Sequence, residues 1–339
     1  MSKLDQIPFY KKGMPYKPIY ETDFLDELKI NWGEEWGIKS AFGKIRKIMV
    51  YRPGEEQKDP LIAEDYQLFN LPEGLTDLAK LQKQHDCLVA VLKAEVIDVV
   101  YLEPKSPLIG TFGIPLRSAP YTREAIMVKG GAIVSRSASA YKKGLEVFQA
   151  KRLMELGCPI LHTIHGRGVF ETSNMVWIDD HSVILSTGMR GNIEGRNQVE
   201  HILRGLGVDY IHYTYLPGFL NKRDKQVGAG SGMFHLDMCF GMANPKVAVL
   251  WPGGVDYDTV KWLQEDKGVD IIEVSDDELQ ACAPNILVVS PNRVIVSAFN
   301  LKMSDELRKR GIEVIEVDLS EFAKGGGGPT CLTLTLIRD

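Results

Sequence analysis

The end of this sequence presents a cysteine behind a loop without side chains. Lys324 is followed by four glycines, Gly325 to Gly328, and then by Pro329, Thr330 and Cys331. Glycine lets another molecule approach the backbone closely, so the run predicts that Cys331 is a nucleophile, with Gly328 beside the substrate. The same run would also fit a C-terminal hinge followed by an ordinary core thiol.

Two further groups carry residues suited to proton transfer and charge pairing. Glu171 lies in RGVFETSN, ahead of an apolar hairpin, and His235 and Asp237 lie in GSGMFHLDMCFGM. If that segment is a strand, His235 and Asp237 point to the same side. A thiol, an imidazole and carboxylates together are the parts of thiol attack assisted by general acid/base catalysis. The alternatives are a structural His235–Asp237 pair and a helix-capping or surface role for Glu171.

Metal and nucleotide chemistry lack a supporting motif. His235, Asp237 and Cys331 could supply nitrogen, oxygen and sulfur ligands to zinc. The sequence has no HxxxH, CxxC or carboxylate-rich loop beside them, and it lacks GxGxxG and GxxxxGK[ST]. We therefore predict neither a metal nor a cofactor. The cysteines read as free thiols of a reducing compartment, since they are odd in number and scattered: Cys87, Cys158, Cys239, Cys282 and Cys331.

Composition narrows the class of protein. The chain has 339 residues and a mass of 37.9 kDa, enough for one large domain or two smaller ones. Its formal net charge of -5 and pI near 5.9 disfavour a nucleic-acid partner. No apolar run reaches the roughly 18 residues that span a bilayer, and the start lacks the apolar segment of a signal peptide. We expect a soluble cytoplasmic protein whose ligand is a small organic molecule, either neutral or cationic. The sequence also allows a homo-oligomer.

A repeated order of elements must position these residues. Residues 285–321 read as a strand, a turn at Pro291 and Asn292, a second strand, a helix over 304–310 ended by Gly311, and a third strand. The helix-stop and strand pattern recurs as LGCPILHTIHG, LGVDYIHYTYL and KGVDIIEVSDD, and the hairpin pattern as EAIMVKGGAIVSR and MVWIDDHSVILST. A spacing of roughly 50 to 60 residues predicts about five ββαβ units. The alternative is a series of unrelated α/β pieces.

The first forty residues differ from the rest. Residues 1–40 carry aromatics without periodicity, namely Tyr10, Tyr16, Tyr20, Trp32 and Trp36. We interpret them as an N-terminal arm that packs on the body, and residues 41–339 as a single catalytic domain. The arm could cover the pocket or mediate a dimer.

The order of the motifs resembles the guanidino-group modifying enzymes, the superfamily of arginine deiminases, dimethylarginine hydrolases and amidinotransferases. The resemblance runs from Gly43 to the end of the chain. It rests on VYRPGEE, YTRE, FETSN followed by GMR, HLD and GGGGPTC, in that order. It implies a five-bladed α/β propeller, the pentein fold, with pseudo-fivefold symmetry and an active site along the central axis.

The resemblance also implies roles for individual residues. Cys331 would attack the guanidinium carbon, and His235 would protonate the departing amine and then activate water or an acceptor amine. Glu171 and Asp237 would hold the guanidinium nitrogens, with Glu124 of YTRE as a third carboxylate. A guanidinium is a resonance-stabilised cation, so a site for it needs paired carboxylates that fix its carbon beside sulfur.

Two departures from the family pattern concern the substrate. Asn174 stands where many hydrolases of the group have an aspartate, and Arg123–Glu124 replaces an Arg–Asp pair. The substrate need not be free arginine. A substrate carboxylate would be bound by Arg190, with Arg123 and Arg196 as further candidates, although arginines at hairpin ends are often solvent-facing ion pairs.

Three functions remain open from the sequence. The leading interpretation is a hydrolase of a guanidino or amidine compound that works through a Cys331 thiouronium intermediate. The second is an amidinotransferase that passes the amidino group of arginine to an amine. The third is a non-catalytic guanidine-binding protein on the same fold.

Overall fold

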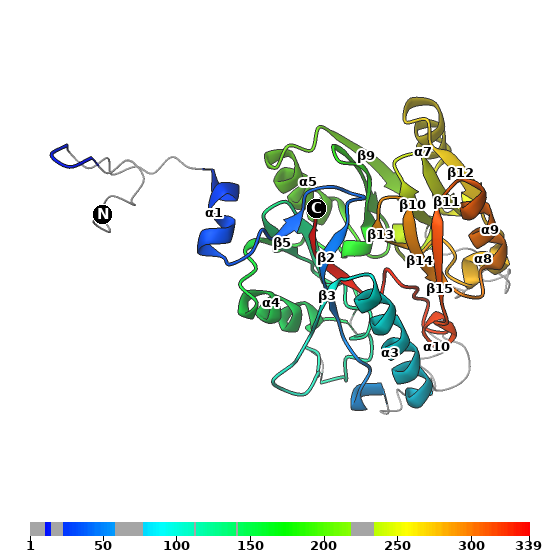
Figure 1. Cartoon of the computed structure of the whole chain (residues 1–339), viewed down its shortest axis with the longest axis horizontal. Coiled ribbons are helices and arrows are strands. Elements are labelled where there is room, and N and C mark those ends of the chain that lie inside the picture. The colour runs from blue at the N-terminus through cyan, green and yellow to red at the C-terminus, as the bar shows by residue number, and fades with distance from the viewer. Residues whose placement is uncertain (1–10, 15–22, 58–76, 112, 140–141, 218–233) are drawn as a thin grey trace.

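The described residues form five small β-sheets, each built in the same order. The computed structural model describes residues 11–14, 23–57, 77–111, 113–139, 142–217 and 234–339. In the four three-stranded sheets the middle strand pairs antiparallel with one neighbour and parallel with the other, and a helix precedes the parallel strand. The four-stranded sheet contains the same three-stranded arrangement with one short strand added at its edge. Figure 1 shows the helices around the outside of the strands. This arrangement confirms the predicted five-bladed α/β propeller of ββαβ units.

Four of the units are continuous in the chain. The first comprises β4 (Ala125–Val128), β5 (Gly131–Val134), α4 (Leu145–Glu155) and β6 (Ile160–Thr163). The second comprises β7 (Met175–Asp179), β8 (Ser182–Thr187), α5 (Ile193–Gly205) and β9 (Tyr210–Tyr215). The third comprises β10 (Phe240–Asn244), β11 (Val247–Leu250), α7 (Tyr257–Lys261), η5 (Trp262–Asp266) and β12 (Asp270–Glu273). The fourth comprises β13 (Leu287–Ser290), β14 (Arg293–Ser297), α9 (Leu301–Lys309) and β15 (Glu313–Val317).

The fifth unit joins the two ends of the chain. Its strands and helix are β16 (Leu334–Arg338), β2 (Ile45–Val50), α3 (Leu78–Ala94) and β3 (Asp98–Tyr101). β16 pairs antiparallel with β2, so the last strand of the chain closes the ring of sheets. The short strand β1 (Gly37–Ile38) adds to the other side of β16. Because β16 begins three residues after Cys331, ring closure also positions the thiol.

Turn and helix-end residues explain the fourth unit, which is the one that the sequence predicts most clearly. The turn between β13 and β14 places Asn292 at φ +56°, and Gly311 ends α9 at φ +75°, a conformation that favours glycine. The predicted helix start at Ser304 is wrong, because α9 begins at Leu301 after Asn300. Ser304 is fully buried inside the helix, so tertiary packing outweighs its preference for a cap.

The core lies between sheets and helices. All residues of β4 and β5 are buried, as expected for strands covered on both faces. On α3, the buried positions Leu81, Leu88 and Leu92 recur at helical spacing and pack with Ile48 of β2. This amphipathic packing holds α3 against its sheet.

The first strands of all five units surround a central cavity of about 170 Å³. Its lining includes Met127, Met175, Met242, Leu287 and Leu334, one from each of these strands. Arg123, Asp237 and Asn285 also line it. Arg123 and Asp237 are thus the predicted site residues that border this cavity, whereas Cys331, His235, Glu171 and Glu124 are not among its lining residues.

The N-terminal region is described only in part. Helix α1 (Phe24–Asn31) lies at one edge of the molecule (Figure 1), and Trp36 is buried. Tyr10, Tyr16 and Tyr20 lie outside the described residues, so the role of the arm stays a prediction. None of the helices in the described part of the chain has the length and apolar character to cross a bilayer.

Candidate active site

Cys331 lies in the turn between α10 (Ser320–Ala323) and β16, with 8% of its surface exposed. Its backbone N–H donates to Oδ1 of Asn285 at 3.1 Å, and the Asn285 side-chain amide donates to the carbonyl of Asp237 at 3.1 Å. Asn285 therefore ties the cysteine to the HLD segment. The sequence did not single out Asn285.

Burial sets the protonation state of the thiol. It raises the pKa of Cys331 well above its usual range, the negative charge of Asp237 raises this pKa further, and Arg123 opposes them. Cys331 is therefore a thiol at neutral pH in the substrate-free protein. An activating group or the substrate itself must accept its proton before it can attack.

The glycine run packs against the protein. A Cβ on Gly325 or Gly327 would collide with the ring of Tyr121, and a Cβ on Gly328 would lie 2.9 Å from the Asn285 carbonyl. The Tyr121 hydroxyl donates to the carbonyl of Phe322 at 3.0 Å. These contacts give the glycines a packing role beside Cys331. Substrate contact at Gly328 stays a prediction.

The HLD segment is not a strand. It forms one helical turn, α6 (Leu236–Cys239), before β10, with His235 in extended conformation ahead of it. His235 and Asp237 therefore do not share a strand face. Nε2 of His235 instead lies 2.8 Å from Oε2 of Glu171, while Asp237 faces Arg123.

Equivalent positions in successive units supply these side chains. Glu171 precedes η3 (Thr172–Asn174) and β7, just as His235 precedes α6 and β10. Glu124 directly precedes β4, and Asn285 lies two residues before β13. The ends of the first strands meet near the central axis, which explains why residues distant in sequence converge.

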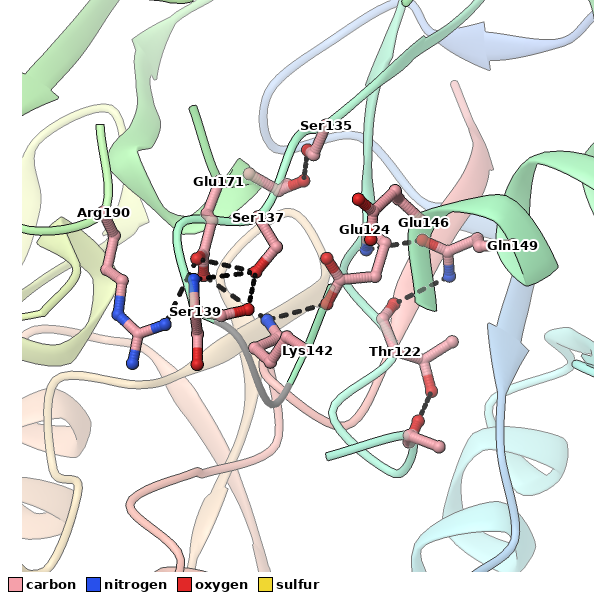
Figure 2. A network of polar contacts seen from close by, with 12 residues as sticks. Thr122, Glu124, Ser135, Ser137, Ser139, Lys142, Glu146, Gln149, Glu171 and Arg190 are labelled. Carbon is pink, nitrogen blue, oxygen red and sulfur yellow. Dashed lines mark hydrogen bonds and ion pairs between the residues drawn. The ribbon is translucent and has the colours of Figure 1, made fainter. Parts of the chain in front are cut away.

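Glu171 is the centre of a buried polar network (Figure 2). Its carboxylate, 1% exposed, accepts hydrogen bonds from the Ala138 N–H at 2.9 Å and the Ser137 hydroxyl at 3.1 Å. Arg190 Nη1 and Lys142 Nζ lie 3.3 and 3.4 Å from its oxygens. Burial alone would raise the pKa of Glu171, but Lys142, His235 and Arg190 together lower it well below the usual value. Glu171 is ionised and orients the His235 ring.

Glu124 is fully buried and has a resident cation. The ammonium of Lys142 lies 2.7 Å from its Oε1. Burial raises the pKa of Glu124 to about 7, Lys142 opposes the rise, and the charge of Glu171 adds to it. Lys142 is a part of the site that the sequence analysis missed.

Asp237 differs from Glu171, whose oxygens accept several hydrogen bonds. It is 5% exposed, and Arg123 Nη1 lies 3.3 Å from Oδ2. Neither oxygen accepts a hydrogen bond from any residue that the structure describes. A buried carboxylate with unfilled acceptor positions is suited to N–H donors of a ligand.

The remaining predicted site residues lie in different surroundings. Asn174 is buried at the end of η3, and its Oδ1 accepts from the Ser186 hydroxyl at 3.1 Å. The Arg190 guanidinium lies 5.0 Å from the Phe234 ring and faces Glu171 rather than solvent. Arg196 instead packs over Tyr213. Whether Asn174, Arg190 or Arg123 binds substrate stays a prediction.

Comparison with known proteins covers nearly the whole chain. A family model described as arginine deiminase matches residues 258–338, which include Cys331. The chain is 25% identical to a 2-nitroimidazole nitrohydrolase of Mycobacterium sp. (strain JS330), over 99% of this chain and 92% of that one. It is 22% identical to the arginine deiminase of Mycobacterium avium (strain 104), over 90% and 98% of the two chains.

A solved structure shares the fold. A dimethylarginine dimethylaminohydrolase variant, as its adduct with S-methyl-L-thiocitrulline, superposes with a TM-score of 0.65 at 21% identity, covering 86% of this chain and 100% of that one. The arginine deiminase match at the C-terminal unit and the similarity to curated relatives support the resemblance to the guanidino-group modifying enzymes, and the solved structure shows the shared pentein fold.

Proposed function

We propose that this protein is a cysteine-dependent hydrolase that cleaves a C–N bond of a guanidino or amidine compound. The names of its relatives support hydrolysis, since they include arginine deiminase and 2-nitroimidazole nitrohydrolase. The site supports the cysteine, because Asn285 connects the buried Cys331 to Asp237 by hydrogen bonds, and His235 lies beside the carboxylate of Glu171.

The unfilled acceptor oxygens of Asp237 carry the proposal. Asp237 is close enough to Cys331 for its charge to raise the thiol pKa, and Asn285 joins the two residues through hydrogen bonds. A planar amidine has N–H donors directed away from its central carbon. Two such donors on Asp237 would hold that carbon near sulfur, which converts a bimolecular attack into an oriented one.

The proposed reaction has two stages. An unprotonated amidine nitrogen of the substrate takes the proton of the Cys331 thiol, and Sγ forms a bond to the amidine carbon. The bond from this carbon to the leaving nitrogen breaks as the protonated His235 gives that nitrogen a proton. His235 then takes a proton from water, and the hydroxide oxygen bonds to the same carbon. The C–S bond breaks, the new hydroxyl group loses its proton to the sulfur, and a ureido or amide product leaves the regenerated thiol.

Glu171 would position His235 throughout this cycle. Its hydrogen bond to Nε2 sets the ring orientation, and its negative charge stabilises the imidazolium that forms when His235 holds a proton. We assign Glu171 a positioning role and Cys331, His235 and Asp237 direct roles.

A turnover assay with and without an amine acceptor tests the function. We expect ammonia or amine release, with a ureido product, from at least one guanidine or amidine of a panel in water alone. Cys331→Ser should abolish this release, and Cys158→Ser, which alters a buried thiol in another unit, should retain it. Product that appears only with glycine present would favour an amidinotransferase. Ligand binding without turnover in the wild-type protein would favour a binding protein.

A further inference from the structure

Lys142 occupies the place between two buried carboxylates that an external cation would otherwise take. Its Nζ lies 2.7 Å from Glu124 and 3.4 Å from Glu171, and its side chain is 15% exposed. Figure 2 shows this ammonium between the two carboxylates, with Arg190 on the other side of Glu171. One lysine thus bridges Glu124 and Glu171.

The charged groups of the site are already paired. Its three buried carboxylates, Glu124, Glu171 and Asp237, have three permanent cations beside them, Lys142, Arg190 and Arg123. Nearby Glu146 accepts the N–H of Gly144 at 2.8 Å at the start of α4. A guanidinium would therefore enter a site without excess negative charge and would face the Lys142 ammonium.

Lys142 keeps its charge. Burial alone would lower the pKa of Lys142, but the charges of Glu124 and Glu171 raise it above its ordinary value. The ammonium therefore cannot make room for a second cation by losing its proton. A guanidinium would have to displace Lys142, and an uncharged group would not.

The protonated thiol points to the same kind of substrate. A neutral amidine has a nitrogen lone pair that can accept the proton of Cys331, which yields a thiolate beside a newly formed amidinium. A guanidinium has no such basic nitrogen, so the proton would have to go elsewhere. Because Cys331 is buried and protonated in the substrate-free protein, the neutral form supplies what attack requires.

We propose that Lys142 is a specificity-determining residue, and that the site favours an amidine-type group that is uncharged when it binds over the permanently charged guanidinium of arginine. Acylguanidines, oxyguanidines and amidines within azole rings belong to this class. The inference rests on the proposed function, of which it names the substrate class.

Two reagents of nearly the same shape test the charge preference without turnover. Chloroacetamide is neutral, and chloroacetamidine is a cation at about pH 8, where Glu124 is ionised. With either reagent the Cys331 thiolate forms an S–C bond, the C–Cl bond breaks and chloride leaves. Peptide mass spectrometry gives the labelling rate of Cys331, separate from that of exposed Cys87. Each rate is divided by the rate of the same reagent with glutathione.

Matched variants separate the effect of the Lys142 charge from the effects of nearby residues. Lys142→Met removes the bridging cation. Lys143→Met is the control, because the Lys143 ammonium donates to the carbonyl of Ser137 and pairs with no carboxylate among the residues that the structure describes. Glu124→Gln removes a negative charge instead, so its effect should have the opposite sign. Glu124→Gln keeps the test decisive if Lys142→Met does not fold.

We expect the wild-type protein to react faster with chloroacetamide than with chloroacetamidine after normalisation. Lys142→Met should shift the ratio toward the cation by at least about tenfold, since a unit charge within a few ångströms is removed. Glu124→Gln should shift it toward the neutral reagent, and Lys143→Met should leave it within about twofold. A wild-type preference for the cation would overturn the inference, as would an unchanged ratio in both Lys142→Met and Glu124→Gln. The hydrolase proposal depends instead on the turnover assay, so the two can fail separately.

Discussion

The two sides of the site stabilise their polar groups in different ways. The charged side comprises Glu124, Lys142, Glu171, Arg190 and His235, and the thiol side comprises Cys331, Asn285, Asp237 and Arg123. On the charged side, Glu171 accepts hydrogen bonds from Ser137 and Ala138. Two cations, Lys142 and Arg190, also lie within 3.4 Å of its oxygens. On the thiol side, Asp237 has Arg123 at 3.3 Å, but neither of its oxygens accepts a hydrogen bond from the described residues. The difference indicates that Glu171 is held in place before substrate arrives, whereas Asp237 keeps acceptor positions for it.

Removal of the Glu171 carboxylate should have the largest effect on stability and turnover. Glu171→Gln leaves Lys142 and Arg190 with less negative charge, and breaking a buried pair typically costs about 3–5 kcal/mol of unfolding free energy. We also expect turnover to fall by at least about a hundredfold, because His235 loses its orienting charge. Urea unfolding and kcat measure the two effects.

Glu155→Gln is the matched control for Glu171→Gln. Glu155 pairs with Lys105 and Arg152 on the surface, so its loss should change stability by less than about 1 kcal/mol and leave turnover intact. Equal effects of the two variants would contradict the central position of Glu171.

On the thiol side, Asn285→Ala should have a smaller effect. It leaves the buried N–H of Cys331 and the carbonyl of Asp237 unsatisfied, at a cost of about 1–3 kcal/mol. Turnover should fall by about tenfold because the thiol is less well oriented. Asn300→Ala removes a comparable buried hydrogen bond, to the carbonyl of Ala281, and should cost stability without that loss of turnover. A loss of turnover shared by both variants would mean that Asn285 only supports the fold.

The smallest effect is a pH-dependent change in stability at Glu124. The folded protein holds the pKa of Glu124 at about 7, above its unfolded value. Its contribution to stability is therefore complete below the unfolded pKa and is lost as pH rises through about 7. Relative to wild type, Glu124→Gln should gain thermal stability as the pH rises from about 4.5 to about 7.5. A difference in Tm that stays constant over this range would contradict the assigned pKa.

The sequence predicted the fold because its signals are local. Hairpins and helix–Gly–strand joints recur with recognisable residues, such as Gly311 after α9 and Asn292 in its turn. It could not predict that HLD forms a helical turn or that α9 starts at Leu301, since packing against neighbouring units decides both.

The site was predictable only in part. Glu124 was predicted only from the family resemblance. Cys331, His235, Glu171 and Asp237 are polar residues among apolar ones, so they were visible in the sequence. Lys142 was not, because lysines near a helix start are ordinarily exposed and only the fold places this one between two carboxylates. Asn285 could have been found from its place just before the first strand of a unit, a position that Glu124 also has.

The most direct test of the central claim is to trap the covalent intermediate. A substrate found in the panel is mixed with the protein, the reaction is quenched in acid during turnover, and peptide mass spectrometry locates any adduct. The account predicts an adduct on Cys331 with the mass of the substrate less its leaving amine, absent from Cys331→Ser. Turnover by Cys331→Ser, or an adduct confined to another residue, would contradict it.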